Sequence, residues 1–138
     1  MKEIILYYTL GGTSKKYSEE RAGNSGADIV EIKEKKTRSK FGAVIPGIFQ
    51  AFGQKSSEIL SIDKNLTDYD KIVLVTPIWA GRQAPAMNSV ATLIPAGKKV
   101  EVVAVSNQGK GYGDTLADKV KSAGGEVSEI INIKSGSL

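Results

Sequence analysis

Three apolar runs in the chain predict buried strands, at residues 4–8, 72–76 and 100–105. A run without alternating polar positions is typical of a parallel strand that is covered on both faces. Each run breaks off into a segment rich in glycine, proline or hydroxyl-bearing residues. The pattern therefore predicts three strands, each followed directly by a tight loop.

Weaker patterns between and after these runs complete a regular alternation of strands and helices. Partly alternating segments at residues 27–32 and 127–133 predict two more strands. Helical character is found at residues 14–22, 44–52 (with Pro46 in its first turn), 86–93 and 114–123. Strands that alternate with helices predict an α/β domain with a doubly wound, five-stranded parallel sheet and helices on both faces. We interpret residues 1–138 as a single domain of this class.

The composition removes several classes of chemistry. The chain contains no histidine and no cysteine, so it lacks the usual residues of thiolate and Ser-His catalysis and of most zinc, iron–sulfur and haem sites. Redox chemistry in such a chain requires a bound cofactor. The formal charge of +4 comes from scattered lysines, a distribution more typical of a solvated surface than of a nucleic-acid interface. We therefore expect no nucleic-acid partner.

The first residues, MKEIILYYTL, contain only a short apolar run. This run is too short to span a membrane, and it has neither the basic flank nor the cleavage site of a signal peptide. We expect a cytoplasmic protein with no membrane partner.

The loop after the first run leads directly into a helix. It consists of Thr9, Leu10, Gly11, Gly12, Thr13 and Ser14. Backbone amides at such a helix start, together with the positive end of the helix dipole, can surround a phosphate without any lysine. An ordinary strand-to-helix turn with a Thr or Ser cap explains these residues equally well. The loop has neither the Gly-Lys-Ser/Thr end of a P-loop nor the glycine spacing of a dinucleotide fingerprint, so a phosphate monoester is the better candidate ligand.

The loops after the other two runs carry flat aromatic side chains. The second consists of Pro77, Ile78, Trp79, Ala80 and Gly81, and the third includes Ser106, Asn107, Gly109, Gly111 and Tyr112. Glycines let the backbone approach a ligand closely, and an aromatic ring beside them can cover a planar group. A core tryptophan and a flexible glycine loop are the plainer interpretations. Because ligands of open α/β sheets bind outside the carboxyl ends of the strands, the three loops together favour a planar ring with a phosphate tail.

Two of these loops resemble those of the flavodoxin-like family of FMN proteins, and the likeness extends along nearly the whole chain. Residues 8–14, Tyr-Thr-Leu-Gly-Gly-Thr-Ser, are similar to the family's phosphate loop. Residues 76–81, Thr-Pro-Ile-Trp-Ala-Gly, are similar to its second loop, and the third loop matches loosely. The resemblance implies FMN as the cofactor and a strand order of 2-1-3-4-5.

The resemblance also implies roles for individual residues. Phosphate contacts fall to Thr9, Gly12, Thr13 and Ser14. Residues 77–81 and 106–112 would hold the isoalloxazine ring, with Trp79 and Tyr112 as the stacking candidates. Arg82 and Lys110 flank these ring loops, and their charge predicts stabilisation of a reduced, anionic flavin.

Three features depart from that family. Gly11 stands where the family usually has a hydroxyl-bearing residue, which removes one donor to the phosphate. The chain is basic, with a pI near 9.2, whereas electron-carrying flavodoxins are typically acidic, so a flavoenzyme or an acidic partner gains weight. A fold of this type normally ends in a helix, but only residues 134–138 follow the last predicted strand. We therefore expect a partly bare sheet face, explained by truncation or covered by a second copy in a homo-oligomer.

These observations favour an FMN-binding redox protein that transfers electrons through its flavin, either as a carrier or as a small oxidoreductase. Its partner would be a redox protein or a small-molecule electron acceptor. No catalytic side chain and no metal site is predicted. The alternative is a flavin-free binding domain that keeps the fold. A receiver domain has the same strand order but needs acidic residues after the first and third strands, where the chain has Tyr8, Thr9, Thr76 and Pro77.

Overall fold

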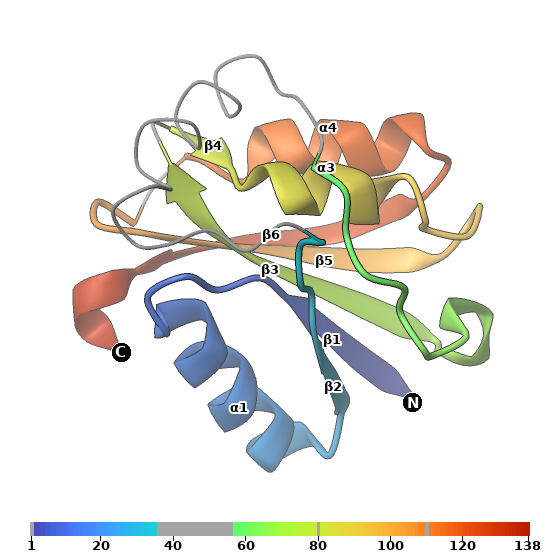
Figure 1. Ribbon diagram of the computed structural model, residues 1–138, viewed down its shortest axis with the longest axis horizontal. Coiled ribbons are helices and arrows are strands. Elements are labelled where there is room, and N and C mark those ends of the chain that lie inside the picture. Colours follow the sequence, from blue (N-terminus) through green and yellow to red (C-terminus); the bar gives the residue numbers. More distant parts are fainter. Residues whose placement is uncertain (1, 36–56, 80, 110) are drawn as a thin grey trace.

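The computed structural model describes residues 2–35, 57–79, 81–109 and 111–138 (Figure 1). In chain order the elements are β1 (Glu3–Tyr7), α1 (Thr13–Ser25), β2 (Asp28–Glu31), the 3-10 turn η1 (Leu66–Asp68), β3 (Lys71–Trp79), β4 (Arg82–Gln83), α3 (Pro85–Ala91), β5 (Lys99–Ser106), α4 (Asp114–Ser122), β6 (Glu126–Lys134) and the 3-10 turn η2 (Ser135–Ser137). The predicted helix at residues 44–52, the candidate residue Ala80 and the flanking residue Lys110 lie outside the described residues.

The sheet has the strand order that the resemblance implied. Its parallel strands run β2-β1-β3-β5-β6, and because β5 and β6 are the fourth and fifth strands of the parallel set, this is the predicted order 2-1-3-4-5. The register is continuous across the centre, where Val73 of β3 lies between Ile5 of β1 and Glu101 of β5. All the carboxyl ends therefore meet at one edge, on the left of Figure 1. The α/β, doubly wound fold class is confirmed.

β3 runs further than its apolar run predicted. The run ends at residue 76 and is followed by proline, yet the strand continues to Trp79. Ile78 and Trp79 pair antiparallel with Gln83 and Arg82 of β4, which makes the predicted loop a short hairpin around Gly81. The prediction of a loop starting at residue 77 is wrong because a two-residue return strand carries no alternation that a sequence pattern would reveal.

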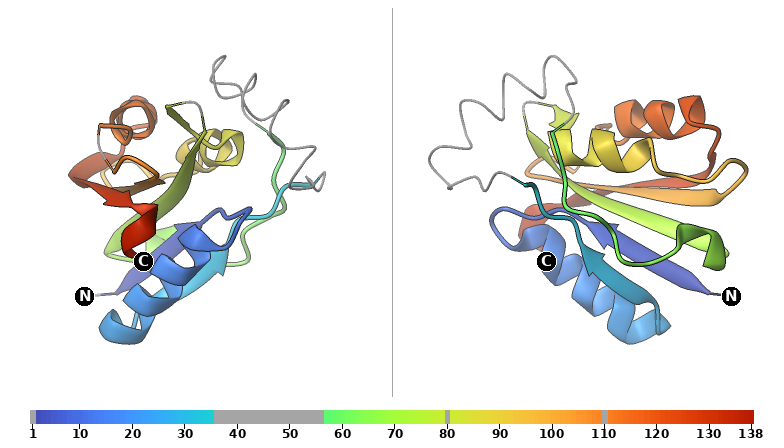
Figure 2. Two further views of the ribbon diagram at one scale, coloured as in Figure 1. Left: turned by 90° about the vertical axis from the view of Figure 1, so that its left-hand side faces the viewer. Right: turned by 45° about the vertical axis from the view of Figure 1, so that its right-hand side comes forward.

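Helices α3 and α4 lie on one face of the sheet and α1 lies on the other (Figure 2). The α3/α4 face carries the larger apolar core. Met87 and Val90 of α3, with Leu116 and Val120 of α4, are each 0% exposed against it. Burying a side chain of this kind contributes roughly 1.5–3 kcal/mol. These contacts hold both helices, and with them the loops before each helix, against the sheet.

The α1 face is held by charge as well as by apolar contacts. The buried residues of α1 are Ser14 and Ser18, which offer little apolar surface. Facing the helix, Glu101 of β5 is 1% exposed. Its Oε1 lies 3.0 Å from Nη2 of Arg21 on α1 and 2.6 Å from Nζ of Lys71 on β3. Burial would raise the pKa of Glu101, but the hydrogen bonds from Arg21 and Lys71 outweigh it and hold this pKa below its usual value.

The sheet face beside α1 is less open than the sequence suggested. After β6 the chain turns through η2, and Leu138 packs against the apolar residues of this face. Val103 and Val105 of β5 are 0% and 4% exposed. Ile131 and Ile133 of β6 are partly buried. The strands of this face are therefore only partly uncovered along β6, and the homo-oligomer stays a prediction.

Candidate functional site

The loops that follow β1, β3 and β5 meet at the carboxyl edge of the sheet. Tyr8, directly after β1, meets Trp79 of β3 edge to face, with ring centroids 5.9 Å apart and ring planes at 77°. A Cβ atom on Gly81 would lie 3.7 Å from the ring of Tyr112, so the hairpin adjoins the third loop. The structure therefore brings together the three loops that the sequence predicted to converge.

The first loop ends at a helix start whose amides face the edge. Gly12, the residue before α1, has a φ of +99°, a conformation that favours glycine. Its amide donates to Oγ1 of Thr9 at 2.9 Å, so a hydrogen bond links the first residue of the loop to the residue before the helix. Among the described residues no side chain caps α1, and its first turn contains no acidic residue. The positive end of the helix dipole is thus available to a phosphate.

Ser14 gives a second indication of an anion site at the same helix start. Its side chain is 1% exposed, and its Oγ has no hydrogen-bond partner in the described part of the chain. Leaving a buried hydroxyl unpaired costs about 1–3 kcal/mol, which a phosphate oxygen would offset. Around it, Leu10 and Thr13 are half-buried and Gly11 is exposed. These residues fit the phosphate group of FMN.

Trp79 lies between the core and the candidate site. Its half-buried side chain packs against the core of the α3/α4 face, so it has part of the role of a core tryptophan. Pro77 and Ile78, which precede it in β3, are also half-buried. Oγ1 of the buried Thr76 accepts a hydrogen bond from the Ala84 amide at 3.1 Å. This hydrogen bond joins the two arms of the hairpin, and together with the core contact of Trp79 it favours a fixed position for that side chain.

The third loop is braced from β6. Oγ of Ser106 accepts the Gly109 amide at 2.8 Å, and Oδ1 of Asn132 accepts the Tyr112 amide at 3.1 Å. Gly109 has a φ of +67°, and a Cβ atom there would lie 2.9 Å from the Cβ and 3.0 Å from the backbone of Lys134. A side chain at this position would have to displace the end of β6.

Two further contacts hold the tip of this loop. The Tyr112 hydroxyl donates to Oε1 of Gln108 at 2.8 Å, and Oδ1 of Asn107 accepts the hydroxyl of Ser135 at 2.9 Å. Gly111 is exposed and has a φ of +69°. The sequence pattern did not predict the role of Ser135, because no local signal marks a residue that braces a loop from another element.

A groove of about 400 Å³ beside the first loop was not predicted either. Its lining residues are Tyr8, Thr9, Leu10, Glu31, Lys33, Glu34, Lys35 and Leu60. Two adjacent tyrosines donate to carboxylates of this groove, Tyr7 to Glu31 at 3.3 Å and Tyr8 to Glu34. Burial, and then the charge of Glu31, raise the pKa of Tyr7 to about 12. Tyr7 therefore stays protonated at neutral pH, and both tyrosines tie β1 to the end of β2 and the segment that follows it.

The described residues contain neither a candidate membrane-spanning helix nor a candidate metal site. No helix in them combines the length and apolar character needed to cross a bilayer. No cluster of acidic side chains in them is arranged to hold a metal ion.

Comparison with known proteins identifies the fold. No family model and no curated protein matches the chain. A flavoprotein from Lactobacillus acidophilus NCFM, solved in complex with FMN, is 21% identical, with 94% of this chain and 91% of that chain covered at a TM-score of 0.78. The two-electron reduced flavodoxin of Megasphaera elsdenii is 16% identical, with 96% and 86% covered at a TM-score of 0.57. A flavodoxin from the domain Archaea is 14% identical, with 95% and 82% covered at a TM-score of 0.57.

These likenesses cover almost the whole chain at low identity, and they show the fold. The chain has a flavodoxin-like α/β fold and resembles flavoproteins of similar length. FMN is bound in the first of these neighbours.

Proposed function

We propose that this chain binds FMN at the carboxyl edge of its sheet and transfers electrons through it, as a carrier or as a small oxidoreductase. The start of α1 carries the proposal: within the described residues its amides are uncapped, and the buried Ser14 hydroxyl has no partner. Trp79 and Tyr112, from the two neighbouring loops, lie at the same edge. An anion site beside two flat rings suits a planar cofactor with a phosphate tail.

Different residues of the site would bind the phosphate and the ring of FMN. Thr13, Ser14 and the amides at the start of α1 would hold the phosphate. Trp79 and Tyr112 would pack on the ring and exclude water from it, while the backbone at Gly109 allows a close approach. FMN, when bound, supplies one- and two-electron transfer. The chain itself contributes position and environment, since it has neither histidine nor cysteine to take part in the reaction.

The test compares FMN with riboflavin, which lacks the phosphate. Protein incubated with excess FMN and then desalted should retain the flavin absorption bands, and fluorescence titration should give a lower Kd for FMN than for riboflavin. Ser14→Ala should raise the Kd for FMN about 10- to 100-fold, because a hydrogen bond to a charged group contributes about 1.5–3 kcal/mol. The same change should leave the Kd for riboflavin unaltered.

Ser18→Ala is the matched control for this test. Ser18 is as buried as Ser14 and, among the described residues, equally unpartnered, but it lies one turn further along α1. Its removal should leave both flavin affinities unchanged, whereas Trp79→Ala should weaken both. A protein that is colourless after desalting and does not quench the fluorescence of added FMN would overturn the proposal in favour of a flavin-free binding domain.

A further inference from the structure

Tyr8 is an aromatic neighbour of Trp79 at the carboxyl edge of the sheet. The two rings meet edge to face, with centroids 5.9 Å apart. Both side chains pack against the core of the α3/α4 face, and Tyr8 is only 5% exposed. Rings in direct contact can exchange an electron without any movement of the chain, so the contact couples Tyr8 electronically to Trp79.

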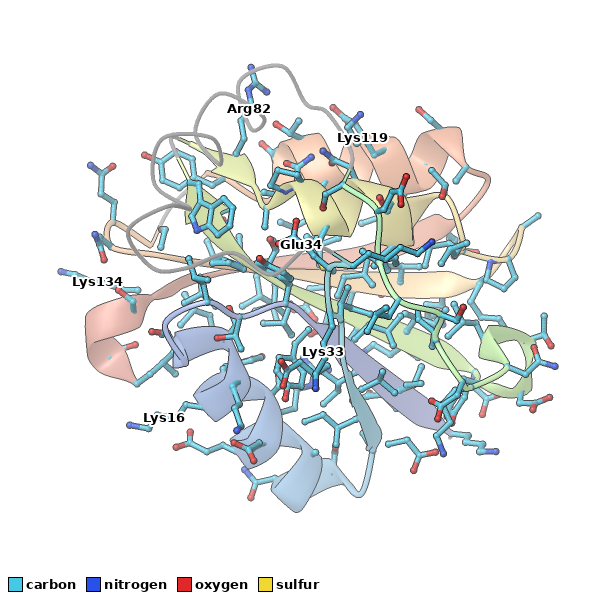
Figure 3. All side chains as sticks on the ribbon, viewed as in Figure 1. Lys16, Lys33, Glu34, Arg82, Lys119 and Lys134 are labelled. Atoms are coloured by element: carbon cyan, nitrogen blue, oxygen red, sulfur yellow. The ribbon has the colours of Figure 1, made fainter. Side chains whose placement is uncertain are left out.

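The hydroxyl of Tyr8 donates a hydrogen bond to a carboxylate, at Oε1 of Glu34. Glu34 is half-buried and lies in the segment that follows β2, near the centre of the view in Figure 3. It also lines the groove of about 400 Å³ beside the first loop. A carboxylate in this position can accept the phenolic proton along an existing hydrogen bond. The groove then gives that proton a route to solvent.

The side chains of tryptophan and tyrosine differ in what their oxidation requires. An indole that loses one electron can hold its proton for a time, whereas a phenol that loses one electron becomes strongly acidic. A buried phenol is therefore oxidised readily only where a base accepts its proton, because an unpaired buried charge is costly. Tyr8 has such a base in Glu34 and an electron acceptor in the ring of Trp79. The chain contains no cysteine that could be oxidised in its place.

The other tyrosines near this edge lack one of these two contacts. Tyr7 also donates to a carboxylate, but it packs in the apolar cluster of the α1 face, on the other side of the sheet from Trp79. Tyr112 adjoins the hairpin, but its hydroxyl donates to the neutral amide of Gln108, a much weaker base than a carboxylate. In the described part of the chain, Tyr8 is the tyrosine that joins a ring contact with Trp79 to a hydrogen bond with a carboxylate.

We propose that Tyr8 is a redox-active tyrosine, which returns an electron to oxidised Trp79 while its phenolic proton moves to Glu34. The inference rests on the proposed function for its oxidant, a photoexcited flavin that takes one electron from the indole of Trp79. Tyr8 then gives one electron to the Trp79 radical cation, its O–H bond breaks, and the Glu34 carboxylate takes the proton. The products are neutral Trp79, a neutral tyrosyl radical and a protonated Glu34. This step protects Trp79 from irreversible oxidation beside the flavin.

Pulse radiolysis of the full chain without flavin tests the step directly. The azide radical removes an electron from tryptophan in preference to tyrosine, and Trp79 is the only tryptophan in the sequence. The absorption of the tryptophan radical should decay into that of the neutral tyrosyl radical, with a first-order rate that is independent of protein concentration. The rate should be lower in heavy water, because a proton moves with the electron.

Four variants identify the electron donor and the proton acceptor. Tyr8→Phe removes the donor, and Glu34→Gln keeps the size of the acceptor but removes its charge. Each should slow the conversion of the tryptophan radical about tenfold or more. Tyr7→Phe and Tyr112→Phe are the matched controls, and both should convert at the wild-type rate. A merely structural role of Tyr8 would not slow the conversion in Glu34→Gln.

A second measurement uses the FMN-loaded protein under continuous blue light in air. Peptide mass spectrometry should find the oxidation products of Trp79 accumulating severalfold faster in Tyr8→Phe than in the wild type. Tyr7→Phe should accumulate them at the wild-type rate, because its ring lies on the other face of the sheet.

These measurements distinguish failure of the Tyr8 step from failure of the proposed function. If FMN is not retained but the azide-generated radical still passes from Trp79 to Tyr8, the flavin proposal fails and the Tyr8 step stands. If FMN is retained but Tyr8→Phe converts as fast as the wild type, the flavin proposal stands and the role of Tyr8 is overturned. Equal rates in the wild type and Glu34→Gln would overturn it too, as would a conversion that is lost in Tyr112→Phe and kept in Tyr8→Phe.

Discussion

The two faces of the sheet are stabilised by different forces. On the α3/α4 face, completely buried apolar side chains such as Met87 and Leu116 fill the space between helix and strand. On the α1 face, the buried Glu101 is paired with Arg21 and Lys71. Apolar contacts are nearly independent of pH and salt, whereas ionic contacts are not. The helix that forms the candidate phosphate site is therefore the one whose attachment depends on charge.

The composition of α1 explains why charge is needed there. Its buried side chains are the two small serines, Ser14 and Ser18, which let the helix lie close to the sheet but bury little apolar area. Tyr17 adds a partly buried ring. Arg21, one helical turn after Tyr17, completes the attachment of α1 through its ion pair with Glu101. The α3 and α4 helices need no such pair because their faces toward the sheet are apolar.

Removal of the buried Glu101 carboxylate should have the largest effect on stability, because it abolishes the ionic attachment of α1. Glu101→Ala leaves Arg21 and Lys71 without their shared partner, so we expect the free energy of unfolding to fall by about 3–5 kcal/mol in urea denaturation at neutral pH. Glu129→Ala is the control, because Glu129 is the cross-strand neighbour of Glu101 on β6 but is exposed. Equal effects of the two changes would show that the buried ion cluster does not hold α1.

An apolar truncation on the other face should have a comparable but salt-independent effect. Leu116→Ala removes a side chain that is 0% exposed, and we expect a loss of about 2–5 kcal/mol. Denaturation in low and high salt should give the same loss for Leu116→Ala and different losses for Glu101→Ala. A salt-sensitive Leu116→Ala variant would contradict the distinction between the faces.

The acid dependence of stability should report the same cluster. Because folding lowers the pKa of Glu101, its contribution is complete above the ordinary value of 4.5 and is lost as the pH falls through the lower folded-state value. Wild-type stability should therefore decline more steeply below about pH 5 than that of Glu101→Gln, which cannot titrate there. Parallel pH profiles for the two proteins would mean that another carboxylate controls acid unfolding.

A change in the third loop should affect the site more than the fold. Gly109→Ala places a non-glycine residue at a φ of +67° against Lys134, and we expect a loss of about 1–3 kcal/mol with weakened FMN binding. Gly111→Ala is the matched control, since Gly111 has a similar φ of +69° but nothing within 4 Å of the added Cβ. Identical results for both would assign the effect to backbone conformation and not to the contact with β6.

The smallest expected effect concerns Tyr69, on the α3/α4 face. Its hydroxyl donates to Oδ2 of Asp28 at 2.7 Å, and Tyr69→Phe should cost about 1 kcal/mol. This hydrogen bond, and then burial, raise the pKa of Tyr69 to about 12. A raised pKa in the folded state stabilises the protein fully below pH 10 and loses that effect as the pH approaches 12. The alkaline decline in stability should be weaker in Tyr69→Phe.

Local patterns in the sequence were sufficient for much of the architecture. The apolar runs at residues 4–8, 72–76 and 100–105 marked the central strands because a strand buried on both faces needs apolar residues at most of its positions. Alternation with helices determined the parallel, doubly wound sheet, because crossovers between parallel strands follow one hand. The resemblance in the first two loops supplied the strand order, which the structure confirms.

The identity of the three loops followed from the same local reasoning, but their internal geometry did not. Gly12 and Ser14 could be placed at a helix start from the sequence, whereas the burial of the Ser14 hydroxyl depends on how α1 lies on the sheet. Asn132 gave no signal of its bond to the Tyr112 amide. The hairpin of β4 was missed because its pairing with β3 involves only two residues on each strand.

Strands, helix starts and the loops between them depend on neighbouring residues, and they could be predicted from the order of the amino acids. The contacts between residues far apart in the chain depend on how the elements pack, and they became visible with the fold. Glu101 lies within an apolar run and is tolerated there because Arg21 and Lys71, from two other elements, converge on it. Hydrophobic periodicity records whether a position is buried, but the partner of a buried charge is chosen by the packing of the whole chain.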